Sequence, residues 1–199
     1  MMFEPLPPET IALQFLLADL HDDLSGRVAR LRLLLAFEAD FGQGRGLLLP
    51  GGTPAQFAYT ETRQAFIQGN FLSVILLSQC VLENVLTAEI GLLSLSNEIK
   101  GVSTIRLKDR PWFRDIVVAG RSAGILGEED ERDLLRLAEL RNALTHFRTV
   151  DDASHIDQRA LSERRAAIEI CEEDARFAIL LFVRILAKPQ FRFRMDPVR

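Results

Sequence analysis

Apolar residues recur every three or four positions along most of the chain, which is the spacing of one face of an α-helix. Leu, Ala, Glu and Arg dominate and β-branched residues are sparse, so helices are favoured over strands. The first predicted helix covers about 9–39 and is interrupted at 25–26. The others are expected at 53–69, from 70 or 73 to about 94, from 111 to about 120 or 124, from 128 to 146 or 147, and from 161 or 162 to about 187. The sequence therefore predicts an all-α bundle of five or six helices.

The length and the hydrophobic content are typical of one globular domain. A chain of 199 residues with 48% hydrophobic residues can bury a core without disulfides or a structural metal. We expect a single helical domain over residues 1–199, with its core at about 53–187. The long N-terminal helix at about 9–39 is expected to pack on this core. A basic C-terminal tail is expected after the core.

Charge and cysteine usage narrow the classes of function. A net charge of −4 excludes an overall basic field of the kind that attracts nucleic acids. Cys80 and Cys171 lie within apolar helical patterns, as reduced core thiols do, and no Cys/His cluster has zinc-site spacing. A local basic groove is still predicted, because arginines gather in one part of the sequence: Arg136, Arg141, Arg148, Arg159, Arg164 and Arg165.

Targeting signals are not evident in the sequence. No basic N-terminal region precedes an apolar run, and no apolar run approaches the ~18 residues that a membrane span needs. We therefore expect a cytoplasmic protein with no membrane contact, and we expect no metal and no cofactor.

The segment 137–148 carries a polar cluster that packing alone does not require. Arg141 supplies a permanent cation with forked donors that suit phosphate oxygens. His146 exchanges protons near neutral pH without special tuning. A guanidinium and an imidazole are the minimum for cleaving RNA without a metal, since one offsets phosphoryl charge and the other moves a proton. Asn142 would orient the substrate or the imidazole, and Thr145 and Arg148 would add phosphate contacts.

Helix geometry sets a condition on this pair. Five residues on a regular helix turn by about 500°, so Arg141 and His146 would project ~140° apart. Asn142 and His146, four residues apart, would share a face. Either the helix ends or distorts near Thr145, or a second copy of the chain completes the site. We favour the second, because a two-fold axis would bring two Arg/His sets into one groove.

Glu83 interrupts the apolar positions of the predicted helix that ends near residue 94. Two interpretations are open. Glu83 is either a solvated residue at the edge of the helix or a buried acid paired with a basic residue, since an unpaired buried carboxylate is costly.

The run Arg141-Asn142-Ala143-Leu144-Thr145-His146 resembles the Arg-x4–6-His motif of HEPN domains, including the polar residue that often follows the arginine. The resemblance covers roughly 53–147 and, more loosely, the final helix. It implies an up-and-down helical bundle, a homodimer with the motifs at its interface, and metal-independent endoribonuclease activity. Catalysis would fall to Arg141 and His146, with Asn142, Thr145, Arg148 and Glu83 in supporting or substrate-binding roles.

The resemblance also implies partners. Many HEPN proteins act on RNA as toxins or in phage defence, and some pair with a nucleotidyltransferase antitoxin. Others serve as non-catalytic modules for protein interaction or regulation, and this alternative stays open here. A purely structural alternative is that Arg141 and His146 satisfy the carbonyl groups and the dipole at a helix C-terminus.

Overall fold

In the computed structural model, the described part of the chain comprises residues 8–39, 49–100, 107–145, 149 and 151–191. These residues contain eight α-helices, one 3-10 helix and no strand, which confirms the all-α class but exceeds the five or six helices predicted. The helices are α1 (Glu9–Asp22), α2 (Leu24–Glu38), α3 (Gly52–Gln68), α4 (Phe71–Ile99), α5 (Phe113–Ser122), α6 (Glu128–Thr145), α7 (Ile156–Glu163), α8 (Ala167–Leu186) and the 3-10 helix η2 (Pro189–Phe191).

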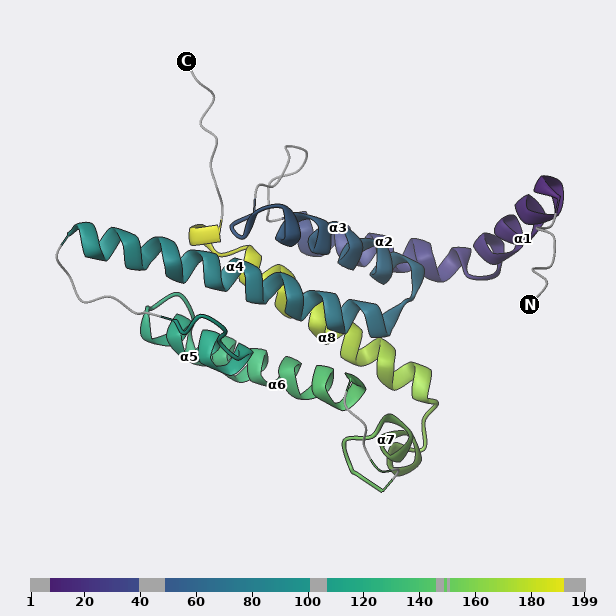
Figure 1. The fold of residues 1–199 in the computed structure, drawn as a ribbon. Coiled ribbons are helices and arrows are strands. Elements are labelled where there is room, and N and C mark those ends of the chain that lie inside the picture. Colours follow the sequence, from purple (N-terminus) through teal and green to yellow (C-terminus); the bar gives the residue numbers. More distant parts are fainter. Residues whose placement is uncertain (1–7, 40–48, 101–106, 146–148, 150, 192–199) are drawn as a thin grey trace, which may run out of the picture.

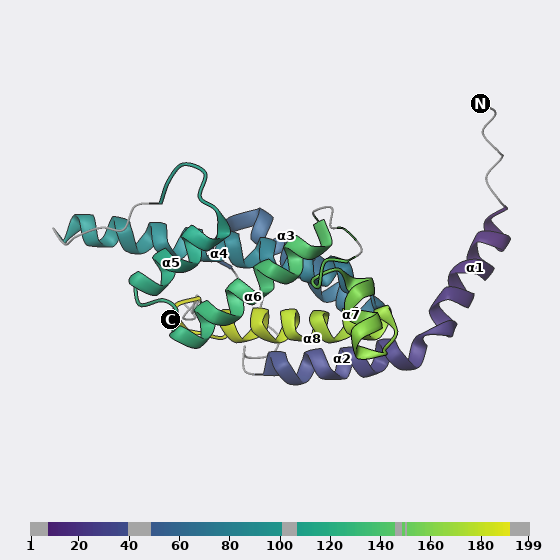
Figure 2. The ribbon, with the colours of Figure 1, turned by 90° about the horizontal axis from the view of Figure 1, so that it is seen from below.

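The bundle is organised around α4 and α8, which pack against each other (Figure 1). On one side α3 packs on α4, and α2 packs on α3 and α8. On the other side α5 and α6 pack on α4, with α6 also touching α8 (Figure 2). The largest buried side chains come from all of these layers, including Phe66 of α3, Leu86 of α4 and Phe182 of α8. One continuous core results, and α2 and α6 lie on opposite sides of the α4–α8 layer.

The central helix α4 runs to Ile99, five residues beyond its predicted end. By length and composition alone α4 could cross a membrane, although no unbroken apolar run in its sequence approaches 18 residues. Half of its most apolar 18-residue window is buried inside the bundle. The central helix of a helical bundle can be as long and as apolar as a membrane-spanning helix, so these two properties of α4 are weak evidence for a membrane span.

The ends of α3 are fixed by glycines in the left-handed region of the backbone. Gly51, with φ of +96°, precedes the helix, and a Cβ there would lie 3.0 Å from the backbone of Asn84 on α4. The helix thus begins at Gly52 rather than at the predicted Thr53-Pro54 cap. At the other end Gly69 has φ of +80°, and its N–H donates to the Phe66 carbonyl over 3.2 Å. Both positions favour glycine because it has no Cβ.

The last predicted helix is two helices in the structure. α7 ends at Glu163, Arg164 takes a left-handed conformation with φ of +54°, and α8 begins at Ala167. The predicted start at Leu161 or Ser162 was therefore wrong. An ion pair holds α7 on α8, since Arg159 donates to both oxygens of Asp174 over 2.6 and 3.0 Å.

The N-terminal helix divides at Asp23 rather than at Ser25-Gly26. α2 packs on the core through Leu34, which is fully buried. α1 has no buried residue and projects from the bundle (Figure 1). The prediction that the whole N-terminal helix packs on the core was thus wrong for α1. The predicted basic tail lies almost entirely in 192–199, outside the described residues.

Candidate functional site

The side of α6 that packs on the core determines where Arg141, the first residue of the motif, lies. Leu134 and Leu137 are fully buried, and Asp130 at the start of the helix accepts from the Gly127 N–H over 2.7 Å. Arg141 follows Leu137 by four residues, so it lies over the same side of the helix. It is half-buried where α6 passes α4.

A pocket of about 320 Å³ opens beside this end of α6. Three structural elements line it: α4, α6 and the segment that leads into α5. The lining residues are Gln79 and Glu83 from α4, Pro111, Trp112, Phe113 and Arg114 from the α5 segment, and Ala138, Arg141 and Asn142 from α6. Three of the residues predicted for the site, Glu83, Arg141 and Asn142, are thus brought together.

Hydrogen bonds orient the motif residues. The Arg141 Nη1 donates to Asn142 Oδ1 over 3.2 Å, and most of the guanidinium donors have no acceptor among the described residues. The hydroxyl of Thr145 donates to the Arg141 carbonyl over 3.0 Å, so this predicted phosphate contact is engaged with its own helix. Thr145 does not line the pocket. His146 and Arg148 lie outside the described residues.

Glu83 is half-buried and accepts a hydrogen bond from Gln79 Nε2 over 2.8 Å. No lysine or arginine of the described residues forms an ion pair with it, so of the two interpretations of Glu83 the buried, base-paired acid is not seen there. Gln79 itself is buried, and its Oε1 has no hydrogen-bond donor within the described part of the chain. A buried carbonyl oxygen without a donor is costly to the folded state.

The start of α5 contributes an aromatic ring, from the N-cap residue Trp112, and a second cation, from Arg114 in the first turn. Trp112 is 80% exposed although it lines the pocket. Its backbone N–H donates to Asp115 Oδ2 over 3.3 Å, which fixes the start of α5. Arg114 is exposed, two residues further on. An exposed indole next to a guanidinium is a surface on which a nucleobase can stack.

The cations of the pocket differ from the other arginines expected in the basic groove. Within the described ranges neither Arg114 nor Arg141 is ion-paired to a carboxylate. By contrast, Arg159 is bound to Asp174, and Arg165 lies 2.7 Å from Glu173. Arg136 stacks over the ring of Phe177 at 4.2 Å. Arg136, Arg159 and Arg165 therefore do not contribute to the predicted groove of six arginines. Two of them are ion-paired, and the third is stacked on an aromatic ring.

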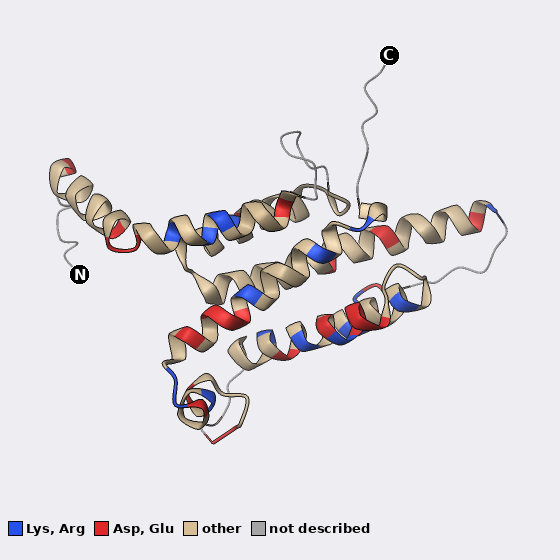
Figure 3. Ribbon diagram, turned by 180° about the vertical axis from the view of Figure 1, so that it is seen from behind, with Lys and Arg blue, Asp and Glu red and all other residues tan. Residues whose placement is uncertain are grey.

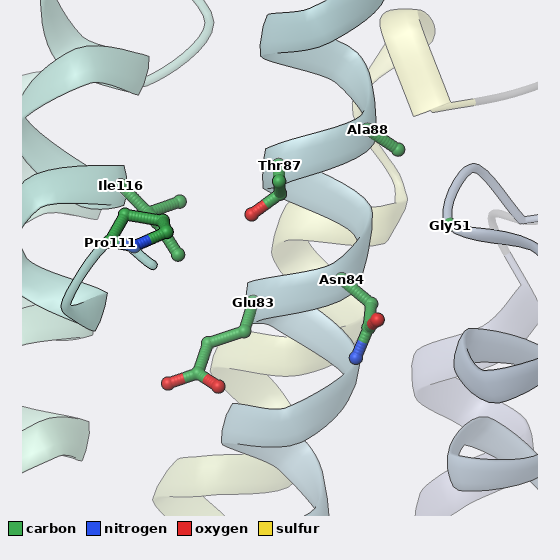
Figure 4. A pocket seen from close by; sticks show the side chains of 7 residues that line it. All are labelled: Gly51, Glu83, Asn84, Thr87, Ala88, Pro111 and Ile116. Carbon is green, nitrogen blue, oxygen red and sulfur yellow. The ribbon is translucent and has the colours of Figure 1, made fainter. Parts of the chain in front are cut away.

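A second pocket, of about 410 Å³, shares Glu83 and Pro111 with the first. It lies between α4 and the α5 segment and reaches the loop at Gly51. Figure 4 shows Glu83 and Thr87 directed toward Pro111 and Ile116, while Asn84 lies on the side of Gly51. Asn84 Nδ2 donates to the Cys80 carbonyl over 2.8 Å. The two pockets thus lie next to each other along α4, with Glu83 lining both.

Nucleophilic cysteine chemistry is disfavoured at this place. Cys80 is exposed, so the expectation of a core thiol was wrong for this residue. Partial desolvation of its sulfur, followed by the negative charges of Glu83 and Glu61, still raises the pKa of the thiol. A thiol with a raised pKa is a poor nucleophile near neutral pH. Among the described residues, no group of three or more His, Cys, Asp or Glu side chains is arranged to hold a metal ion.

Gln79, Trp112 and Arg114 are pocket residues that the sequence analysis missed. Gln79 precedes Glu83 by four residues, so helical periodicity alone could have placed it beside the predicted acid. Trp112 and Arg114 carry no such signal, because the packing of α5 on α4 and α6 brings them to the motif.

Comparisons of the chain with models of protein families, with curated proteins and with solved structures found no match.

Proposed function

We propose that the protein is a HEPN-like, metal-independent endoribonuclease, and that the pocket at Arg141 binds single-stranded RNA. The observation that carries the proposal is that an exposed indole and two guanidinium groups, neither of which has a carboxylate partner among the described residues, surround one pocket beside the motif. Arginine forks suit phosphate oxygens, and aromatic faces stack on unpaired bases. A duplex would offer the indole no free base face.

The proposed reaction needs no metal. The ribose 2′-oxygen attacks the adjacent phosphorus while its proton passes to a base, and the bond from phosphorus to the 5′-oxygen breaks. The leaving 5′-oxygen takes a proton, and the products are a 2′,3′-cyclic phosphate and a 5′-hydroxyl. His146 is the proton carrier in this proposal, and Arg141 offsets the charge that builds on the phosphoryl oxygens.

The pocket also suggests how the substrate is held. Asn142 keeps Arg141 in place through the hydrogen bond between them. The Glu83 carboxylate would repel a phosphate placed next to it, so we expect the phosphate to lie on the Arg114–Arg141 side of the pocket.

A ribonuclease assay in EDTA tests the proposal. Wild-type protein should cleave single-stranded RNA into products with cyclic phosphate ends, and a 2′-deoxy substitution at the scissile position should block cleavage. Arg141→Ala should reduce cleavage by about 10²–10³-fold and His146→Ala should abolish it, while the helical content is kept. Arg132→Ala is the matched control, because Arg132 lies on the same helix, outside the pocket and ion-paired to Asp133. No cleavage of any RNA by the wild type, or full cleavage by Arg141→Ala, would overturn the proposal.

A role as a growth-inhibiting toxin would follow from the same activity. Expression of the wild type in a bacterial host should then arrest growth, whereas His146→Ala should not. An antitoxin, such as a nucleotidyltransferase, would restore growth when co-expressed. Growth that is unaffected by an active ribonuclease would count against the toxin role and leave the cleavage chemistry standing.

The second candidate is a non-catalytic HEPN-like module for protein interaction. One observation favours it: Glu83 places a carboxylate inside the pocket, where a polyanionic substrate is disfavoured. This candidate predicts that substitutions of exposed apolar residues change the function, whereas His146→Ala does not. The two candidates separate in the same assay, because only the ribonuclease cleaves RNA.

A further inference from the structure

The N-terminal arm, defined as α1 and α2 (residues 9–38), exposes more large apolar side chains than a monomer can easily keep in water. None of the residues of α1 is buried. Apolar side chains surround this helix on all sides, which is typical of a helix that other protein covers. The exposed apolar residues of the arm are Ile11, Leu13, Phe15, Leu16, Leu17, Leu20, Leu24, Val28, Leu31 and Leu35.

Seven of these residues follow one another along the sequence with the spacing of a coiled coil, on two helices that meet at an angle at Asp23 (Figure 2). Consecutive members are alternately four and three residues apart, as in a heptad repeat, except that two steps of four follow each other where α1 meets α2. We call this series the arm seam: Leu13, Leu17, Leu20, Leu24, Val28, Leu31 and Leu35. Within each helix the seam positions fall inside roughly 60° of one another. Their exposures range from 37% at Leu31 to 54% at Leu13.

The arm seam is a palindrome about Leu24. Leu20 and Val28 lie four residues before and after it, and the next two pairs follow at equal distances on the two sides. When a second arm is laid antiparallel with the two Leu24 side chains opposite each other, every seam residue therefore meets a seam residue. A two-fold axis through Leu24 generates this arrangement.

Charge along the arm supports the antiparallel orientation. The α1 half, residues 9–23, contains Glu9, Asp19, Asp22 and Asp23 and no lysine or arginine. The α2 half, residues 24–38, contains Arg27, Arg30, Arg32 and one acid, Glu38, which is ion-paired to Arg63 (Figure 3). Arg27 and Arg30 are ion-paired to Asp19 and Asp23 of the same chain, and Arg30 is buried. Within the described residues, the charges of the arm that have no ion-pair partner are Glu9 and Asp22 in the α1 half and Arg32 in the α2 half. Antiparallel arms keep these like charges apart, whereas parallel arms would place each beside its own copy.

The same charges argue against a membrane as the occupant. Helices that lie on lipid surfaces carry lysine and arginine on their polar face, and anionic lipids repel acids. The most exposed apolar part of the arm is its acidic half. We therefore propose that the arm seam pairs with the arm seam of a second copy of this chain, in an antiparallel two-fold contact centred on Leu24.

This contact is separate from the candidate ribonuclease site. α2 and α6 lie on opposite sides of the α4–α8 layer, so paired arms leave the Arg141 pocket open (Figure 2). The proposal does not depend on RNA cleavage, and either can fail without the other.

The mass of the particle in solution gives the first test. By analytical ultracentrifugation we expect Leu17→Asp and Leu31→Asp each to halve the mass of the wild-type particle. Both residues are exposed in the monomer, so the fold should persist. Phe15→Asp is the matched control, since Phe15 is 71% exposed on the opposite side of α1 and should leave the mass unchanged. A monomeric wild type, or a mass unaffected by Leu17→Asp, would overturn the proposal.

Cross-linking tests the register. In a background of Cys80→Ser and Cys171→Ser, Leu24→Cys should form a disulfide between two chains on mild oxidation. Leu13→Cys alone should not, but it should cross-link to Leu35→Cys on another chain. Self-cross-linking of Leu13→Cys in addition to that of Leu24→Cys would indicate parallel arms and refute the palindrome. Binding of the wild type to vesicles of neutral and anionic phospholipid, in place of self-association, would assign the arm to lipid and overturn the proposal.

Discussion

At the scale of single residues, the arginine of the motif combines a charge with a particular shape. Arg141 has one guanidinium nitrogen on Asn142, and the described residues offer it no carboxylate. A lysine would keep the charge but lose the fork that holds two phosphate oxygens at once. The distinction matters because charge alone would support RNA binding, whereas cleavage needs donors aimed at the developing charge.

We expect Arg141→Lys to bind RNA nearly as well as the wild type but to cleave it more slowly. Arg141→Ala should lose about 10²–10³-fold in kcat, the usual effect of removing one donor to a developing oxyanion. The lysine variant should fall between the two, with KM less affected than kcat. Single-turnover cleavage with saturating protein measures the step. An equal loss in both variants would mean that the fork, and not the charge, carries the whole effect, whereas no loss in either would remove Arg141 from catalysis.

A second prediction concerns Glu89 of α4, which is buried with 8% of its surface exposed. Burial raises the pKa of its carboxyl group. The folded state therefore holds the proton more tightly than the unfolded state, and the stability linked to this group is full below the ordinary pKa of glutamate. It is lost as the pH rises through the raised pKa.

Glu89→Gln should consequently unfold at a higher denaturant concentration than the wild type at pH 7, and at nearly the same concentration near about pH 4. Urea titrations at the two pH values measure the difference. The exposed Glu139 provides the control, since Glu139→Gln should change neither titration. A variant that is less stable than the wild type at pH 7 would mean that the Glu89 carboxylate has a partner that stabilises it.

At the scale of helices, an ion pair decides how α7 lies on the bundle. Asp174 is nearly buried on α8, and the side chain of Arg159 remains 26% exposed. Removing the carboxylate leaves the guanidinium without both of its acceptors. We expect Asp174→Ala to destabilise the protein by about 1–3 kcal/mol, less than for a fully buried pair because solvent screens Arg159.

Chemical denaturation measures this loss, and Glu172→Ala on the same helix is the comparison. Glu172 is paired with Arg176 at the surface, so its removal should cost no more than about 0.5 kcal/mol. Equal effects of the two variants would show that the Arg159 contact contributes no more than an ordinary surface pair.

The helices also show what sequence patterns could and could not predict. Spacing correctly placed α3, α5 and α6 because each has a regular buried side and a clear end, such as Gly69 after α3. It missed the division between α7 and α8, because a left-handed arginine at position 164 gives no local signal. It ended α4 too early, because Leu95 and Ile99 are exposed there and do not continue the buried side.

The candidate site divides in the same way. Glu83, Arg141 and Asn142 stand out in the sequence because polar residues interrupt apolar helix faces, and the structure brings these three to one pocket. Trp112 and Arg114 come from a segment some thirty residues before Arg141, and only the packing of α5 on α6 joins them to it. Local patterns therefore found the residues on helices and missed those that tertiary contacts deliver.

At the scale of the whole molecule, the layers separate two surfaces that could join copies of the chain. The arm seam lies on the α2 side of the α4–α8 layer, and the Arg141 pocket lies on the α6 side (Figure 1). α6 is helical through Thr145, one residue before His146. If that helical geometry continues, Arg141 and His146 project ~140° apart and cannot reach one phosphate within one chain. The prediction that two copies share the site follows from this geometry.

Complementation tests that prediction directly. Co-expressed in equal amounts, Arg141→Ala and His146→Ala chains should recover about a quarter of the wild-type cleavage, since half of the dimers are mixed and each mixed dimer has one intact site. The same recovery should occur when both chains also carry Leu17→Asp, because the arm lies on the other side of the molecule. Mixed dimers that form but stay inactive would place Arg141 and His146 of one chain at the same phosphate, which requires the helix to end or bend directly after Thr145.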